Sequence, residues 1–209
     1  KALVDRHKND QILVIGAYLD QLHEIGEYLQ APIIQGATTN KERERLAWIH
    51  VEALNHALRD ISPESVRHHT CYGLNHGPRM NDIPLTDAVP FMLKINAGAH
   101  SFEVANPRHY HEWRIWEDIK LPDDKILIPG LITQSTVLVE HPELVAQRLI
   151  RFAEIVGRER VIAGADCGFA SFAGSNEVHP SIVWAKFQAL SEGARIAGQV
   201  SRGDTIVPP

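Results

Sequence analysis

The sequence has only two cysteines among its 209 residues, which excludes a fold held together by a disulfide framework. It also has no apolar run long enough to cross a membrane, and its charged segment 1–10 lacks the pattern of a secretory signal. We therefore expect a cytoplasmic protein. In that reducing compartment both thiols stay free to bind a metal.

Basic clusters and phosphate-binding turns are missing as well. The formal net charge is −5 and no run is rich in Lys and Arg, which argues against a nucleic-acid-binding surface. Neither a Gly-x-Gly-x-x-Gly turn nor a phosphate loop is present, which weighs against a nucleotide-binding sheet. We expect neither nucleic acid nor a membrane as a partner.

Predicted strands and helices alternate along the chain. The predicted strands are 28–30, 66–71, 99–105, 125–130 and 160–165. The predicted helices are 12–27, 39–60, 85–95, 109–119, 142–156 and 181–199. Strict alternation predicts parallel βα units with right-handed crossovers, in a single domain over residues 1–209. The pattern alone leaves open whether these units form a doubly wound sheet or part of a barrel.

The side chains best suited to bind a metal lie around the two cysteines. His69 and Cys71 are two residues apart in a predicted strand, so both side chains project to the same face. Cys167 follows the predicted strand 160–165, and imidazole and thiolate are the ligands that Zn²⁺ prefers. The alternative is a histidine and thiols that are simply buried in the core.

Glu103 adds a carboxylate to this set. It lies at the carboxyl end of the predicted strand 99–105, since an acid in the strand interior would be costly. Catalytic zinc sites often gather ligands from distant strands. Nearby, His109 and His111 are either partners of the metal site or solvated side chains at a helix start, and Arg108 is a candidate to bind an anionic substrate group.

Three short runs contain these residues: His69-Thr70-Cys71, Ser101-Phe102-Glu103 and Asp166-Cys167-Gly168-Phe169. They resemble the zinc-binding half of the cobalamin-independent methionine synthase family, in particular its shorter, single-barrel "methionine synthase II-like" branch. Further similarity, in the same order, covers 51–58, 81–85, 105–109, 127–130, 139–145 and 184–186. The resemblance therefore extends over nearly the whole chain.

The resemblance implies a (βα)₈ TIM barrel of which this chain supplies about the last five βα units. It implies Zn²⁺ at the carboxyl-terminal face, where the metal takes up a thiol substrate that attacks a methyl or other alkyl carbon. The family's typical pair is 5-methyltetrahydrofolate and homocysteine. The implied metal ligands are His69, Cys71, Glu103 and Cys167; Asp166 is expected to be catalytic, and Asn106, Arg108 and Asp82 to contact the substrate.

The chain also departs from the family pattern. No Ile-Asp pair stands between Gln30 and Ala31, and Thr133 stands where the branch tends to have an aspartate. Two alternatives therefore stay open: a truncated, non-catalytic zinc-bearing relative, or an alkyl transferase that uses another thiol such as coenzyme M. Because five strands cannot close an eight-stranded barrel, we expect either an oligomer or a missing amino-terminal half.

Overall fold

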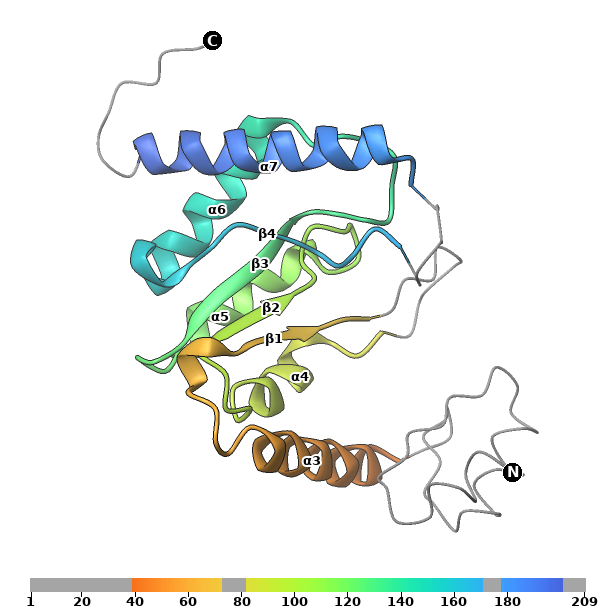
Figure 1. Cartoon of the computed structure of the whole chain (residues 1–209), viewed down its shortest axis with the longest axis vertical. Helices are drawn as coiled ribbons and strands as arrows, with labels where there is room; N and C mark the ends of the chain where they lie inside the picture. Colours follow the sequence, from red (N-terminus) through yellow and green to blue (C-terminus); the bar gives the residue numbers. More distant parts are fainter. Residues whose placement is uncertain (1–38, 73–81, 171–177, 201–209) are drawn as a thin grey trace, which may run out of the picture. The chain divides into compact units, whose positions relative to one another are not determined.

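A computed structural model describes residues 39–72, 82–170 and 178–200 (Figure 1). The chain divides into two compact units, residues 1–49 and 50–209. Of the first unit, the description covers only 39–49, where helix α3 (Asn40–Ala57) begins. The predicted helix 12–27 and strand 28–30 lie outside the described residues, and the single domain expected over the whole chain stays a prediction.

The second unit contains a parallel sheet whose four strands lie in sequence order, as the alternating pattern predicts (Figure 1). The strands are β1 (Arg67–Thr70), β2 (Ala99–Phe102), β3 (Ile126–Ile132) and β4 (Gly164–Ala165). The α/β class and the parallel arrangement are therefore confirmed. Closure of a barrel is not shown, because among the described residues β1 and β4 are the two outer strands.

Helices follow the strands close to the predicted positions, with two differences. The α-helices after β1 are α4 (Leu85–Met92), α5 (Ile115–Asp118), α6 (Pro142–Val156) and α7 (Pro180–Val200). The α-helix predicted over 109–119 is wrong in its first half, where Tyr110–Arg114 form a 3₁₀-helix. The strand predicted over 160–165 is reduced to Gly164–Ala165. Arg160 ends a 3₁₀-helix, Arg158–Arg160, and Val161 forms only an isolated bridge with Leu127.

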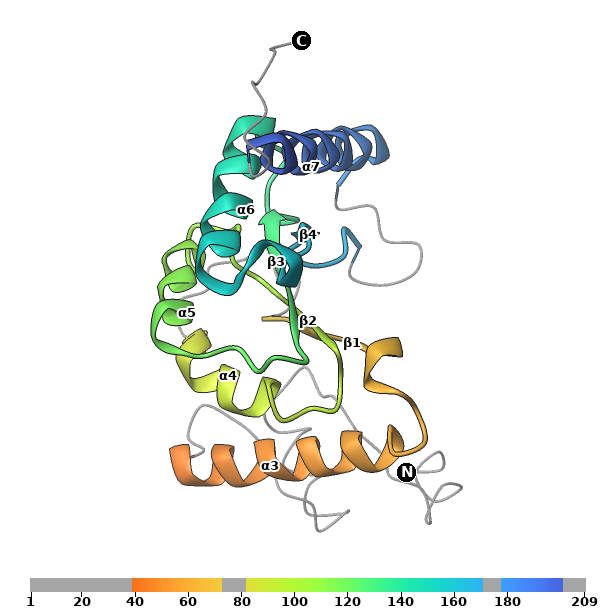
Figure 2. The same ribbon diagram turned by 90° about the vertical axis from the view of Figure 1, so that its left-hand side faces the viewer.

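The main apolar core lies between one face of the sheet and helices α4, α5 and α6 (Figure 2). Phe102 of β2 and Leu127 of β3 are fully buried there, and Trp116 of α5 packs beside Phe102 with ring centroids 5.5 Å apart. Because side chains alternate along a strand, residues such as Ser101 face the opposite side of the sheet. That opposite face carries His69, the register partner of Ser101.

None of the described helices is both long enough and apolar enough to span a bilayer. Within the described part of the chain, β1 and β4 each pair with a strand on one side only, and such edges can pair with another segment. The expected oligomer or completing segment remains a prediction.

One histidine of β2 faces the core. His100 is fully buried, and its ring lies 5.7 Å from the ring of His68. Burial, with smaller contributions from His68 and Lys125, lowers the pKa of His100 to about 4. The folded state therefore holds His100 neutral at a pH where the unfolded chain takes up a proton.

This burial makes the protein sensitive to acid. Between about pH 7.5 and about pH 5 the unfolded state binds more protons than the folded state. The effect of His100 should therefore lower the free energy of unfolding by about 2 kcal/mol as the pH falls over this interval. Over the same pH interval, the free energy of unfolding of His100→Phe should fall by about 2 kcal/mol less than that of the wild type. Urea unfolding at both pH values measures the two changes. Equal losses in the wild type and the variant would contradict the prediction.

Candidate metal centre

Three donor side chains lie together at the carboxyl edge of the sheet. His69 belongs to β1, Cys71 follows directly after β1, and Cys167 follows β4. Their candidate donor atoms all lie within 4.8 Å of one another, and the two Sγ atoms are 3.3 Å apart. The fold thus joins the two cysteines from its two outer described strands, 96 positions apart in the sequence.

The neighbouring strand orients the imidazole of this group. Nδ1 of His69 lies 3.1 Å from Oγ of Ser101, its register partner on β2. When Nδ1–H donates to this hydroxyl, Nε2 carries the lone pair that binds a metal. Partial burial lowers the pKa of His69, against opposing effects of Glu103 and Ser101, and this shift favours the neutral, ligating form of the imidazole.

The donor set fits Zn²⁺. Thiolates and imidazole are the soft and borderline ligands that this ion prefers. Two sulfur atoms bound to one tetrahedral zinc stand about 3.8 Å apart, and the 3.3 Å separation of Cys71 and Cys167 is within a small side-chain adjustment of that value. Three protein donors would leave one position of a tetrahedral site for a substrate or water.

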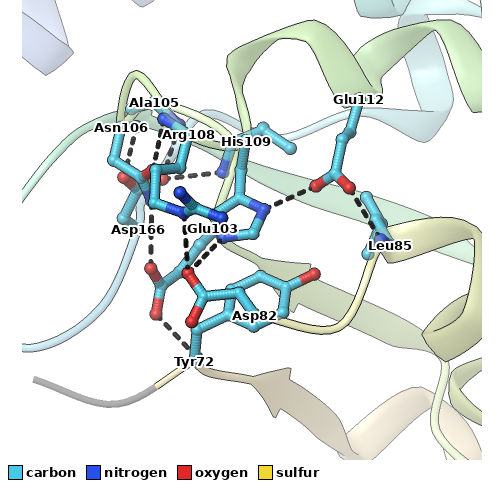
Figure 3. A network of polar contacts seen from close by, with 11 residues as sticks. Tyr72, Asp82, Leu85, Glu103, Ala105, Asn106, Arg108, His109, Glu112 and Asp166 are labelled. Atoms are coloured by element: carbon cyan, nitrogen blue, oxygen red, sulfur yellow. Dashed lines mark hydrogen bonds and ion pairs between the residues drawn. The ribbon is translucent and has the colours of Figure 1, made fainter. Parts of the chain in front are cut away.

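Glu103, the fourth predicted ligand, lies outside this three-residue group. Its carboxylate is fully buried and accepts hydrogen bonds from the backbone N–H of Tyr72 at 2.9 Å and from Nδ2 of Asn106 at 3.1 Å (Figure 3). Glu103 therefore ties the segment after Cys71 to the segment after β2. Its role as a metal ligand stays a prediction.

Asp166 holds the segment that follows β2. Its carboxylate accepts three consecutive backbone N–H groups, from Val104, Ala105 and Asn106, at 2.8, 2.7 and 2.9 Å (Figure 3). Burial raises the pKa of Asp166 to about 6, although the hydrogen bonds from Ala105 and Val104 act in the opposite direction. The structure gives this residue a structural role, and its expected catalytic role stays a prediction.

Asp166 reaches this segment across β3 at Gly130. A Cβ atom at position 130 would lie only 2.0 Å from Oδ1 of Asp166. Glycine is therefore required here by the close approach of a carboxylate, because any side chain would displace it.

The three predicted substrate-binding residues bond to other residues of the site. Nε of Arg108 lies 3.2 Å from Oδ2 of Asp82, and Arg108 remains 41% exposed. Asn106 is buried and links Glu103 to the backbone N–H of Arg108. Arg108 therefore keeps a solvent-facing surface for an anionic group, whereas Asn106 is embedded. Contact of any of the three with a substrate remains a prediction.

His109 and His111 lie in different environments, and a role of either as a partner of the metal site stays a prediction. His111 is exposed, as a solvated residue would be, whereas His109 is 3% exposed. Its Nδ1 lies 2.7 Å from Oε2 of Glu112, and its Nε2 lies 3.1 Å from Oδ2 of Asp82. Sequence reasoning missed Glu112, and the available signal was its spacing: residues three apart lie above one another in a 3₁₀-helix.

A search of solved structures found a similar fold in a B12-independent methionine synthase from Shewanella sp. W3-18-1, in complex with selenomethionine. The TM-score is 0.58 at 21% identity, and the match covers 73% of this chain and 44% of that chain. The two folds are similar. A putative vitamin-B12 independent methionine synthase from Listeria monocytogenes aligns with a TM-score of 0.48 and 18% identity, over 80% of this chain and 44% of that chain.

Sequence comparison found only short similarity to curated proteins. The DNA 3'-5' helicase XPB of Mycobacterium tuberculosis is 56% identical over 46 residues, which is 22% of this chain and 8% of the helicase. The XPB of Kineococcus radiotolerans is 52% identical over 44 residues, again 8% of the helicase. No protein-family model matches the chain. A match to so small a part of a helicase does not indicate helicase activity in this chain.

The contact between Gly130 and Asp166 predicts an asymmetric response to alanine. Gly130→Ala should lower the free energy of unfolding by about 2 kcal/mol, because the new methyl group displaces a buried, hydrogen-bonded carboxylate. Gly168→Ala is the matched control: its Cβ would meet no atom within 4 Å, so its effect should stay within about 0.5 kcal/mol. Urea unfolding measures both, and equal effects would overturn the requirement for glycine at position 130.

Proposed function

We propose that this chain carries the zinc-binding half of a methyl- or alkyl-transfer site that acts on a thiol. The observation that carries the proposal is the convergence of His69, Cys71 and Cys167 at the carboxyl edge of a parallel sheet. This edge is where α/β folds place their active sites. The similarity of the fold to a B12-independent methionine synthase supports the same conclusion.

The reaction consists of a nucleophilic substitution at carbon. The thiol loses its proton, the sulfur forms a bond to the methyl or alkyl carbon, and the electron pair of the broken bond leaves with the donor. A bound Zn²⁺ would supply the first requirement, since a free thiol has a pKa of about 8.5 and a coordinated thiol is deprotonated.

The residues of the chain position the reactants. Ser101 orients His69, and Glu103 holds Tyr72 next to Cys71. Asp166 fixes the turn from which the side chain of Arg108 projects, partly exposed, toward solvent. This partial exposure supports the proposal that Arg108 binds an anionic group of either substrate, since its guanidinium has a fork of donors suited to a carboxylate.

Removal of the thiolates should abolish metal binding. The wild-type protein should bind about one Zn²⁺, and Cys71→Ser/Cys167→Ser should bind none, because loss of two thiolates from a small ligand set removes most of the affinity. Ser101→Ala is the graded control and should keep the metal with about 10- to 100-fold weaker affinity, since it removes only a partner of His69. Full zinc stoichiometry in the double variant would show that Cys71 and Cys167 are not metal ligands.

Turnover by this chain alone should be slow. We expect weak or no methionine synthase activity with 5-methyltetrahydrofolate and homocysteine, because the chain spans only 44% of the similar methionine synthase and catalysis needs both reactants oriented together. A rate of about 1 s⁻¹ or more would contradict this expectation.

The thiol is identified separately from turnover. In the Co²⁺-substituted protein, the thiol that coordinates the metal changes the visible absorption spectrum. A change with homocysteine supports the methionine synthase assignment, whereas a change only with coenzyme M supports the alternative alkyl transferase. No change with any thiol supports a non-catalytic metal site.

A further inference from the structure

The residue after Cys71 is held from two sides. The backbone N–H of Tyr72 donates to Glu103, and the ring of Tyr72 stacks on the imidazole of His109 with centroids 4.0 Å apart and an angle of 1° between the planes. β1 ends at Thr70, so Cys71 and Tyr72 lie beyond the ladder that pairs β1 with β2. These contacts continue the attachment of the chain to the sheet past the end of the strand.

The imidazole that receives Tyr72 is itself fixed. Glu112 and Asp82 each approach one ring nitrogen of His109, at 2.7 and 3.1 Å, so the ring cannot rotate without breaking a hydrogen bond (Figure 3). Glu112 is held in turn, because its other oxygen accepts the backbone N–H of Leu85 at 2.8 Å, at the start of α4. The stacking surface is therefore anchored to a helix start.

The charge of this group strengthens the arrangement. Burial disfavours the protonated ring, but the hydrogen bonds to Glu112 and Asp82 outweigh it and raise the pKa of His109. A raised pKa favours the protonated ring, whose charge over the face of Tyr72 adds a cation–π attraction to the stacking. A neutral, freely rotating histidine would give Tyr72 a weaker and less defined surface.

We propose that His109 is a positioning residue of the metal centre, which fixes Cys71 and Glu103 through the ring and the backbone of Tyr72. The inference rests on the proposed function, since the position of a donor atom matters here only if a metal binds. His109 makes no contact with the substrates in this scheme. It sets the geometry of Cys71, a member of the donor group, and of Glu103, which holds the backbone of Tyr72.

The experiment compares two matched pairs of variants. Tyr72→Ala removes the stacked ring and Tyr72→Phe keeps it. His109→Gln removes the imidazole, and His111→Gln changes an exposed histidine of the 3₁₀-helix that begins directly after His109. For each variant of the 209-residue chain we would measure the Zn²⁺ dissociation constant against a competing chelator. The Co²⁺ absorption spectrum reports ligand geometry, and the melting temperature of the metal-free protein reports stability.

Tyr72→Ala and His109→Gln should each weaken Zn²⁺ binding by about 10- to 100-fold and change the Co²⁺ spectrum. Tyr72→Phe and His111→Gln should leave both unchanged. The Tyr72→Ala/His109→Gln double variant should bind no more weakly than either single variant, because the two residues act as one unit.

Several outcomes would overturn the inference. It fails if metal affinity and the Co²⁺ spectrum are unchanged while only the melting temperature falls, since that is the signature of a purely structural contact. It also fails if the losses in the double variant are additive. If His109→Gln does not fold, equal affinities of Tyr72→Ala and Tyr72→Phe are sufficient to reject it. A wild-type protein that binds no zinc with both thiols reduced rejects the proposed function itself, which is a different result.

Discussion

The reach of one carboxylate across a strand is the constraint on which the candidate site depends. Asp166 follows β4, yet it binds three backbone N–H groups that follow β2, and β3 lies between them. Charge-assisted hydrogen bonds of this kind contribute about 1.5–3 kcal/mol each where they are buried. The turn that they fix carries Asn106 toward Glu103, and Glu103 in turn holds Tyr72 beside Cys71. Donors from the two outer strands are thereby linked by one continuous set of contacts.

Much of this arrangement could be predicted from the sequence. The alternation of strands and helices indicated a parallel sheet, and that sheet places Cys71 and Cys167 at one edge because all its strands point the same way. The period of two in the strand predicted over 66–71 placed His69 and Cys71 on one face, and both belong to the donor group although β1 ends at Thr70. Both inferences rest on the backbone alone, which is why they hold without knowledge of side-chain packing.

The residues that sequence reasoning missed all act through tertiary contacts. The sequence gives no sign that Ser101 differs from any other strand residue, because its contact with His69 depends on the register of β1 and β2. From its residue type, Glu112 would be expected in solvent. It is buried in a 3₁₀-helix, a segment that was expected to be α-helical. The separation of Glu103 from the donor group could not be foreseen either, because it depends on hydrogen bonds to Tyr72 and Asn106 rather than on its place in the strand.

The close approach of the two thiols also makes this site a target for oxidation. Cys71 is exposed, and its sulfur lies 3.3 Å from that of Cys167, so an oxidant that removes two electrons and two protons could join them with little movement of the chain. Such a bridge would tie the end of β1 to the end of β4 and consume both sulfur donors. Protein handled without a reductant would then contain no metal, because its two sulfur donors are joined in a disulfide and not because the reduced site lacks affinity.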